Sequence, residues 1–389
     1  MSKPIYLSAK EAAAELGVQP ATLYAYVSRG FVRSIAGPGR SKRYAAEDIR
    51  QLCDKREHGR ETEADNFGVL LQSSITLITD DGPFYRGQPA INLAKNASLE
   101  TVATLLWDCR ADPFGETVEN HDLQNCPLPA RPVERAMFAL SLWPLKDRTA
   151  YALNRDVLVR QGAMIMRLVV AALLNEPVSA APMHEFLARQ WGIDDPEIIS
   201  MIRAALVLSA DHELNTSAYA VRCAASTRAP LHAALLAGLG AFLGPRHGAA
   251  SDRVESWLSA MRDPSGVRME MEARVMRGEP LYGFGHLIYE DADPRADLLL
   301  SMIERHGLNR PFVDALGSIR KEALTLYGLH PNIDFALAAL RNYAGLPDGA
   351  AMVLFCAGRM SGWIAHALEQ YEQPDQIRPR ATYTGQRPR

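Results

Sequence analysis

The sequence predicts a mainly α-helical protein that carries a small basic unit at its N-terminus. Over most of the 389 residues, apolar residues recur every three or four positions, the spacing of one helix face. The apolar/polar alternation typical of strands is confined to short pieces such as residues 74–79. Residues 1–60 hold 11 Lys and Arg against 6 Asp and Glu; since the whole chain carries −3, the remainder carries −8. This asymmetry predicts two parts with different partners.

Composition favours a compact soluble protein. Hydrophobic residues make up 48% and charged residues 22%, which is close to the average for globular domains. The longest nearly uninterrupted apolar stretch, residues 233–244, has 12 residues, fewer than the roughly 20 that cross a bilayer. The first 30 residues contain no signal-type apolar core, and the five cysteines form no C-x-x-C pair. We therefore expect a cytoplasmic protein without a disulfide framework or a Cys-rich zinc site, neither embedded in a membrane nor secreted.

Two short helices are predicted within the first 30 residues. Ser8 followed three positions later by Glu11 is a capping-box pattern, and it predicts a helix that Gly17 ends. A second helix is expected from about Pro20, which suits a first helical turn, with Leu23 on its buried face. Two helices joined by so short a turn form a helix-turn-helix.

A hairpin with a basic tip is predicted after these helices. Residues 31–35 form its first strand, the Gly-Pro-Gly turn at 37–39 reverses the chain, and residues 40–44 return with three basic side chains. A third helix from Glu47 closes the unit. We place this first domain at residues 1–60 and a charge-dense linker at 61–67.

The rest of the chain is predicted to form long helices. A proline-rich surface loop is expected over 112–132. The segments with helical apolar spacing are 99–107, 135–142, 157–174, 196–210, 217–225, 231–242, 254–261, 297–305, 310–327, 333–341 and 352–371.

Three histidines lie in turn or small-residue contexts, where a side chain is usually presented to a ligand. They are His212 in Asp-His-Glu-Leu-Asn, His247 in Gly-Pro-Arg-His-Gly and His286 in Gly-Phe-Gly-His. Flanking glycines let a backbone and a ligand approach closely, and histidine titrates near neutral pH. Any one of them alone is better explained as a packed or surface histidine, but three together favour a site.

Further polar residues lie beside Pro or Gly. Asp334, in Pro-Asn-Ile-Asp, begins a predicted helix, and taken alone it is best explained as a carboxylate favoured by the helix dipole. Arg295 follows Asp-Pro, Arg359 lies in Gly-Arg-Met-Ser-Gly, and Arg378 lies in Ile-Arg-Pro-Arg. The planar guanidinium of arginine matches carboxylates in a bidentate way, although an isolated arginine is usually only solvated.

In order and spacing, this series of motifs resembles the citrate synthase family. The resemblance covers about residues 68–389 and includes Tyr-Arg-Gly at 85–87 and the Ile-Arg-Pro-Arg-x-x-Tyr-Thr-Gly run at 377–385. It implies a helical large domain, residues 68–248 with 346–389, and a smaller helical domain inserted at 249–345. It also implies a homodimer that closes over its substrates, oxaloacetate and an acyl-CoA.

The same resemblance implies roles for individual residues. Asp334 would remove a methyl proton from acetyl-CoA, while His247 stabilises the enol or enolate and His286 polarises the ketone of oxaloacetate. The dicarboxylate would be held by His212, Arg295, Arg359 and, from the partner subunit, Arg378. Neither a metal nor a redox cofactor is required, because coenzyme A enters as part of a substrate.

Two positions depart from the family pattern. Leu287 and Glu290 stand where members often carry basic residues near the phosphates of coenzyme A, which points to altered affinity or acyl specificity. Propionyl-CoA, giving 2-methylcitrate, therefore remains an alternative donor, because one methylene is discriminated by only about 1 to 3 kcal/mol. A DNA-binding regulator with a ligand-sensing body is the alternative from another class.

The N-terminal unit resembles the winged helix-turn-helix of mercury-resistance-regulator and excisionase-like proteins. The motifs are Tyr-Leu-Ser-Ala-Lys-Glu-Ala-Ala-Ala-Glu-Leu-Gly, then Ala-Thr-Leu-Tyr-Ala-Tyr-Val, then the basic turn that ends in Arg-Tyr. If the unit binds DNA, side chains of the second helix would face the major groove and basic residues would contact phosphates or a minor groove. The first group is Gln19, Thr22 and Tyr24, and the second is Arg29, Arg40, Lys42 and Arg43. The alternative is an accessory domain that packs on the enzyme or binds another protein.

Overall fold

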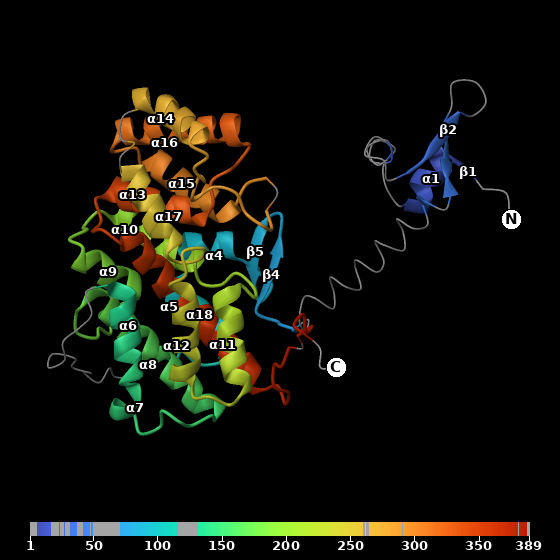
Figure 1. Cartoon of the computed structure of the whole chain (residues 1–389). Coiled ribbons are helices and arrows are strands. Elements are labelled where there is room, and N and C mark those ends of the chain that lie inside the picture. The colour runs from blue at the N-terminus through green and yellow to red at the C-terminus, as the bar shows by residue number, and fades with distance from the viewer. Residues whose placement is uncertain are drawn as a thin grey trace. The chain divides into compact units, whose positions relative to one another are not determined.

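The computed structural model describes residues 6–16, 23, 27, 32–36, 42–46, 48–49, 71–115, 131–259, 261, 264–289, 291–379 and 381–386. The chain divides into two compact units (Figure 1). The first comprises residues 1–72 with 378–389, and the second comprises residues 73–377. Each unit has its own cluster of buried hydrophobic residues.

The first unit combines a short capped helix with a three-stranded sheet. Strand β3 (Lys42–Ala45) lies in the middle and pairs antiparallel with β1 (Tyr6–Ser8) and with β2 (Ser34–Ala36). In α1 (Ala9–Leu16) the capping box is formed, because the Ser8 hydroxyl accepts from the Glu11 N–H and the Glu11 carboxylate accepts from the Ser8 N–H. The predicted first helix and the hairpin are thus confirmed, whereas β1 was not foreseen.

The predicted second helix of this unit, whose side chains were expected to face the major groove of DNA, lies almost wholly outside the described residues. Leu23, expected on its buried face, is fully buried. The side chains of Lys42 and Arg43 on β3 are exposed. The other predicted DNA contacts, Gln19, Thr22, Tyr24, Arg29 and Arg40, lie outside the described residues.

Over its described residues, the second unit is mainly helical with one small antiparallel sheet, which confirms the predicted fold class for this part. The sheet has the order β4 (Thr76–Thr79), β5 (Gly82–Tyr85) and β6 (Gln88–Pro89). The helices are α4 (Ala90–Asn96), α5 (Leu99–Leu106), α6 (Pro132–Ser141), α7 (Trp143–Lys146), α8 (Arg155–Leu174), α9 (Met183–Gln190), α10 (Pro196–Leu208), α11 (Thr216–Ser226), α12 (Leu231–Phe242), α13 (Ala250–Ser259), α14 (Pro264–Met276), α15 (Pro294–His306), α16 (Arg310–Tyr327), α17 (Ile333–Ala344) and α18 (Ala350–Tyr371).

The predicted helices agree closely with these bounds. The predicted ranges for α12 and α16 match the structure residue for residue. Helices α4, α7 and α9 were missed; they have seven, four and eight residues, and so short a segment shows little of the helical period. Helix α14 was missed because its sequence is charge-rich, with Val267 and Met271 as its fully buried hydrophobic residues. Most of the predicted loop at 112–132 lies outside the described residues.

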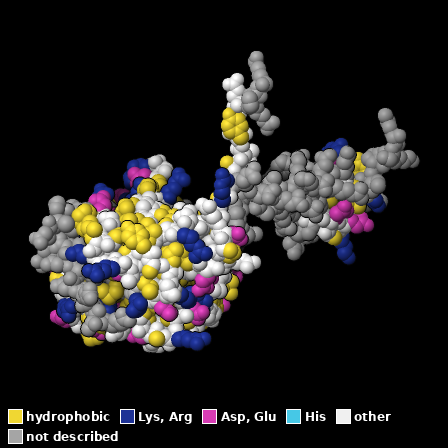
Figure 2. Space-filling model, turned by 90° about the horizontal axis from the view of Figure 1, so that it is seen from below, with side chains coloured by type: hydrophobic (Ala, Val, Ile, Leu, Met, Phe, Trp, Pro, Cys, Tyr) yellow, Lys and Arg dark blue, Asp and Glu magenta, His cyan; other side chains and the backbone are white. Residues whose placement is uncertain are grey.

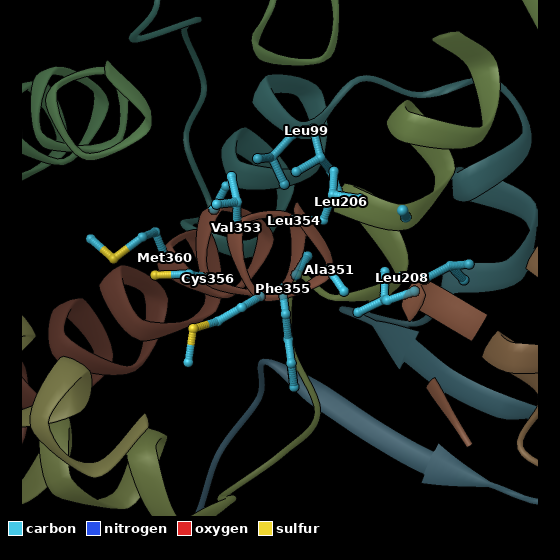
Figure 3. Packing of buried hydrophobic residues seen from close by; sticks show 14 of the residues in the cluster. Leu99, Leu206, Leu208, Ala351, Val353, Leu354, Phe355, Cys356 and Met360 are labelled. Atoms are coloured by element: carbon cyan, nitrogen blue, oxygen red, sulfur yellow. The ribbon is translucent and has the colours of Figure 1, made fainter. Parts of the chain in front are cut away.

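Helix α18 forms the centre of the second unit. It packs against α5 and α10, and Leu99 of α5 and Leu206 and Leu208 of α10 belong to the same hydrophobic cluster as its side chains (Figure 3). Helix α18 lies so close to α10 that a Cβ on Gly358 would be 2.5 Å from the Leu206 carbonyl oxygen. Glycine permits this approach because it has no Cβ. A Cβ on Gly362 would lie 2.4 Å from the Ala210 carbonyl oxygen.

Two helices, α8 and α18, are long and apolar enough to cross a membrane by length and composition. Of their most apolar windows, 72% and 100% is buried inside the protein. Burial of this kind is typical of the core helices of globular proteins.

Helices α13 to α17 pack on one another at one end of the second unit (Figure 1). Helices α13 and α15 lie against α17, and α14 lies against α16. An aromatic cluster joins α13 to α17, because the ring of Phe335 lies 6.0 Å from Trp257 and 4.7 Å from Phe284. This cluster positions the N-termini of α13 and α17, which carry two of the polar residues discussed below.

Candidate active site

The loop between α10 and α11 presents His212. The imidazole is buried, and its Nε2 atom lies 3.0 Å from the hydroxyl of Tyr289. Asp211, the residue before His212, links this loop to α18. Its carboxylate is buried, and its Oδ1 atom lies 3.2 Å from Nε2 of His366 in α18. Burial, followed by the charges of Arg295 and Arg359, lowers the pKa of His212 well below its usual value. His212 is therefore neutral near pH 7.

His286 lies beside His212, with ring centroids 5.1 Å apart. Its loop is tied to the segment before α17, because the Gly285 N–H donates to the His330 carbonyl at 2.8 Å. Gly285 has φ of +77°, which favours glycine. The Nδ1 atom of His286 accepts from the backbone N–H groups of Ile288 and Tyr289, at 3.1 and 3.3 Å. In the neutral ring the hydrogen is therefore on Nε2, which can donate to a ligand oxygen.

His247 follows α12 and is fixed from α11. Its Nε2 atom lies 2.7 Å from the hydroxyl of Ser217, which also accepts from the Trp363 indole N–H at 3.0 Å. A Cβ on Gly248 would lie 2.4 Å from the ring of Phe242, so the close packing of this turn requires glycine. Burial, with a contribution from Arg359, lowers the pKa of His247 to about 4. This imidazole is also neutral near pH 7.

Asp334 lies in the first turn of α17, as predicted. The helix begins at Asn332, whose side chain accepts from the Asp334 N–H at 3.0 Å. One carboxylate oxygen of Asp334, Oδ1, accepts a hydrogen bond from the Ser251 hydroxyl at 2.5 Å. Burial raises the pKa of Asp334 from 3.8 to about 6, although Ser251, Arg295 and Arg359 each favour the ionised form. A carboxyl group with such a pKa can act as a base near neutral pH.

Arg295 is buried in the first turn of α15 and is paired with Asp293. Its Nε and Nη2 atoms donate to the two oxygens of Asp293 at 2.9 and 2.8 Å. Asp293 also caps α15 and accepts from the Ile333 N–H at 3.1 Å, which joins α15 to the start of α17. The sequence analysis missed this carboxylate. Its position directly before Pro294, shortly ahead of the helix predicted at 297–305, was the available signal.

Arg359 is almost completely buried in α18. Its Nε atom donates to the Ser209 carbonyl at 2.9 Å, and this is the one hydrogen bond that the guanidinium makes to residues the structure describes. A guanidinium has five N–H donors. The remaining donors are therefore available to an anionic ligand, while the buried carboxylate of Asp211 balances part of the charge.

The structure gathers six of the seven predicted substrate-site residues in the second unit. The three histidines, Asp334, Arg295 and Arg359 are linked by direct contacts or act on one another's pKa values. Arg378 is exposed and belongs to the first unit, so it is not part of this group. Leu287 is fully exposed beside His286, and Glu290 lies outside the described residues.

A metal-binding cluster is not evident in the described part of the chain, where no three His, Cys, Asp or Glu side chains are arranged to hold an ion. The group contains instead a base, neutral N–H donors and two buried cations. Such a set can bind a small dicarboxylate and move a proton beside it.

Comparisons with known proteins agree with this description. Residues 68–380 match the family described as "Citrate synthase, C-terminal domain". "Citrate synthase 2" of Bacillus subtilis is 30% identical over 360 residues, covering 82% of this chain and 94% of the relative. "2-methylcitrate synthase" of Mycobacterium tuberculosis is 28% identical over 335 residues, covering 77% and 84%.

A solved structure is similar over the same region. It is the ternary complex of carboxymethyl coenzyme A and oxaloacetate with citrate synthase from Thermoplasma acidophilum, with a TM-score of 0.72 and 24% identity. The match covers 84% of this chain and 97% of that one. The family match and the relatives lead to one conclusion: the chain belongs to the citrate synthase family and is an acyltransferase of that family.

Proposed function

We propose that the protein condenses acetyl-CoA with oxaloacetate and water to give citrate and coenzyme A. The observation that carries the proposal is the grouping of Asp334, whose pKa is about 6, with two buried arginines and three histidines. The Thermoplasma relative, which is bound to oxaloacetate and a coenzyme A analogue, supports the choice of substrates. A cytoplasmic location is part of the proposal.

The first step is removal of a proton from the acyl methyl group. Asp334 accepts this proton as the C–H bond breaks, and the electron pair moves towards the thioester oxygen. His247, neutral because its pKa is about 4, donates a hydrogen bond to that oxygen from Nδ1, while its Nε2 atom accepts from the Ser217 hydroxyl. An uncharged donor and a weakly basic carboxylate thereby share the cost of enolisation.

The second step forms the carbon–carbon bond. His286 donates from Nε2 to the ketone oxygen of oxaloacetate and protonates it as the new bond forms. Arg359, Arg295 and His212 hold the two carboxylates, since all three are buried and both arginines act on the pKa of His212. Hydrolysis of the resulting thioester makes the condensation effectively irreversible.

A homodimer completes the proposed site. Helix α12 contains no charged residue, and its partly exposed positions, Ala233, Leu236, Ala237 and Ala241, are apolar. A face of this kind favours packing against a second copy. The partner subunit's Arg378 would then reach the dicarboxylate. We further propose that the small domain, residues 249–345, closes on the large domain, residues 68–248 with 346–389.

The acyl donor is identified by measuring thiol release from acetyl-CoA and from propionyl-CoA, each with and without oxaloacetate. The Asp334→Ala variant is the control. We expect oxaloacetate-dependent release that the variant loses, with acetyl-CoA the better donor. Preference for propionyl-CoA would assign 2-methylcitrate, the product named for the Mycobacterium tuberculosis relative. Binding of oxaloacetate without any thiol release would favour the ligand-sensing regulator.

A second proposed activity is DNA binding by the first unit as a winged helix-turn-helix. The exposed Lys42 and Arg43 on β3, the capped α1 and the sequence motifs support it. The test is the retention of random duplex DNA at low salt by the full chain, compared with a Lys42→Glu/Arg43→Glu variant. Retention that the variant loses and that falls as salt rises supports DNA binding. Equal retention of both proteins, or of neither, contradicts it.

A further inference from the structure

Ser251 is a buried residue whose side chain contacts the carboxylate of Asp334. It lies in the first turn of α13 and is completely buried. Its hydroxyl donates to Oδ1 of Asp334 at 2.5 Å, across the junction between α13 and α17. A hydrogen bond to a charged acceptor is shorter and stronger than one between neutral groups.

We propose that Ser251 positions the catalytic base, holding Oδ1 of Asp334 so that Oδ2 is the oxygen that takes the substrate proton. This inference rests on the proposed condensation. Within the described residues, Oδ1 accepts from Ser251 and Oδ2 accepts no recorded hydrogen bond. The two oxygens are therefore not equivalent. The acyl C–H bond breaks, the proton moves to Oδ2, and the electron pair moves to the thioester oxygen.

The surrounding packing makes the contact rigid. Val254 and Leu258 lie on the same buried face of α13 as Ser251. A Cβ on Gly283 would lie 3.0 Å from Val254 and 3.1 Å from Phe335 of α17, so the two helices are held closely on both sides of that turn. The hydroxyl is thus presented to Asp334 by a fixed backbone and does not depend on a flexible side chain.

Ser251 also acts on the charge of the base. The other groups that influence Asp334 are Arg295 and Asp293 at the start of α15 and Arg359 in α18. Arg295, Arg359 and Ser251 favour the carboxylate, whereas burial and Asp293 oppose it. Loss of the hydroxyl therefore leaves Asp334 harder to ionise.

The test is the pH dependence of kcat/KM for acetyl-CoA in the full-length protein. Wild type is expected to lose activity below about pH 6, and Ser251→Ala to move this limb upward by about one pH unit. The isotope effect on kcat/KM with trideuteroacetyl-CoA is expected to increase in Ser251→Ala, because proton transfer becomes slower. KM for oxaloacetate should stay unchanged, since Arg295 and Arg359 are untouched.

Matched variants separate positioning from packing. Ser251→Thr keeps the hydroxyl and is expected to restore the wild-type pH limb. Ser251→Cys keeps the buried volume with a weaker donor, and it carries the test if Ser251→Ala unfolds. Ser259→Ala is the control, because the Ser259 hydroxyl also joins α13 to α17, through Asn342 at 2.9 Å, without touching Asp334.

The outcomes are distinct. An unshifted pH limb and an unchanged isotope effect in both Ser251→Ala and Ser251→Cys, with wild type active, would overturn the role of Ser251. An equal shift in Ser259→Ala would also overturn it, by attributing the effect to packing. Absence of oxaloacetate-dependent thiol release in wild type would overturn the proposed condensation, and with it this inference.

Discussion

The two sides of the candidate active site hold their charges in different ways. On the side formed by α15 and α17, Arg295 is neutralised by a bidentate pair with Asp293, and this carboxylate also ties Arg295 to the start of α17. On the α18 side, Arg359 has no such partner among the described residues and donates to a backbone carbonyl. The first arrangement fixes a geometry, and the second leaves a buried charge for a ligand.

This difference suggests that the two sides of the site have different roles. The α15/α17 side carries Asp334, the proposed base, which must be held in a defined position. The α18 side carries Arg359, whose guanidinium attracts an anion. Figure 2 shows hydrophobic side chains lying among Lys, Arg, Asp and Glu side chains on the face seen from below. Substitutions on each side test whether these roles are separate.

Asp334→Asn should cause the largest loss of activity. The amide is nearly isosteric but cannot accept the methyl proton, so kcat should fall by about 10² to 10⁴-fold. KM for oxaloacetate should change little, because the cations remain. Steady-state kinetics at pH 8 measure both constants, and near-normal kcat would show that another group is the base.

Asp293→Asn should cause the largest loss of stability. It removes the charge that compensates Arg295 in a fully buried site, which typically costs about 3 to 5 kcal/mol. Asp297→Asn is the matched control on the same helix, since the side chain of Asp297 is half-exposed and lies 3.7 Å from Arg320. Urea unfolding of both variants measures the difference, and equal stabilities would contradict the structural role of Asp293.

Arg359→Lys should weaken binding more than chemistry. Lysine keeps the charge but loses the planar fork, so KM for oxaloacetate should rise by roughly 10 to 100-fold, about 1.4 to 2.8 kcal/mol. Arg222→Lys is the control, because Arg222 is equally buried but pairs with Glu369 at 2.5 Å. A raised KM in the control alone would reverse the assignment.

Asp334→Asn should also change stability in a pH-dependent way. The folded-state pKa of Asp334, about 6, is above its usual 3.8, so ionisation of this group costs wild type stability as pH rises through this range. The asparagine variant does not titrate. It should be more stable than wild type at pH 8 by on the order of 2 kcal/mol, allowing for partial exposure, and should match wild type near pH 4. Thermal melts at both pH values test this, and a variant that is less stable at pH 8 would contradict the raised pKa.

Local patterns predicted much of this architecture from the sequence. The capping box at Ser8 and Glu11, and the helix that begins at Asn332, depend on residues three or fewer positions apart, so the sequence shows them directly. The candidate site was found through histidines and arginines beside Gly and Pro, a pattern that is also short-range. Asp293 was overlooked because its role depends on an N–H from Ile333, forty residues away.

Contacts between residues far apart in the chain leave no periodic pattern or motif in the sequence. Ser251 lies in a segment that is unremarkable as a sequence, and its importance appears only where α13 meets α17. The pKa of Asp334 likewise depends on burial, on a hydrogen bond from α13, and on charges at the start of α15 and in α18. Such contacts required the folded structure.

The central claim, that the second unit condenses an acyl-CoA with oxaloacetate through Asp334, is tested most directly by the product. Acetyl-CoA labelled with ¹³C in both acetyl carbons is incubated with oxaloacetate and the full-length protein, and the products are analysed by mass spectrometry. We predict citrate that carries both labelled carbons with wild type, and citrate reduced by at least about 10²-fold with Asp334→Asn. Unlabelled oxaloacetate recovered intact with wild type, or labelled citrate formed equally by the variant, would contradict the claim.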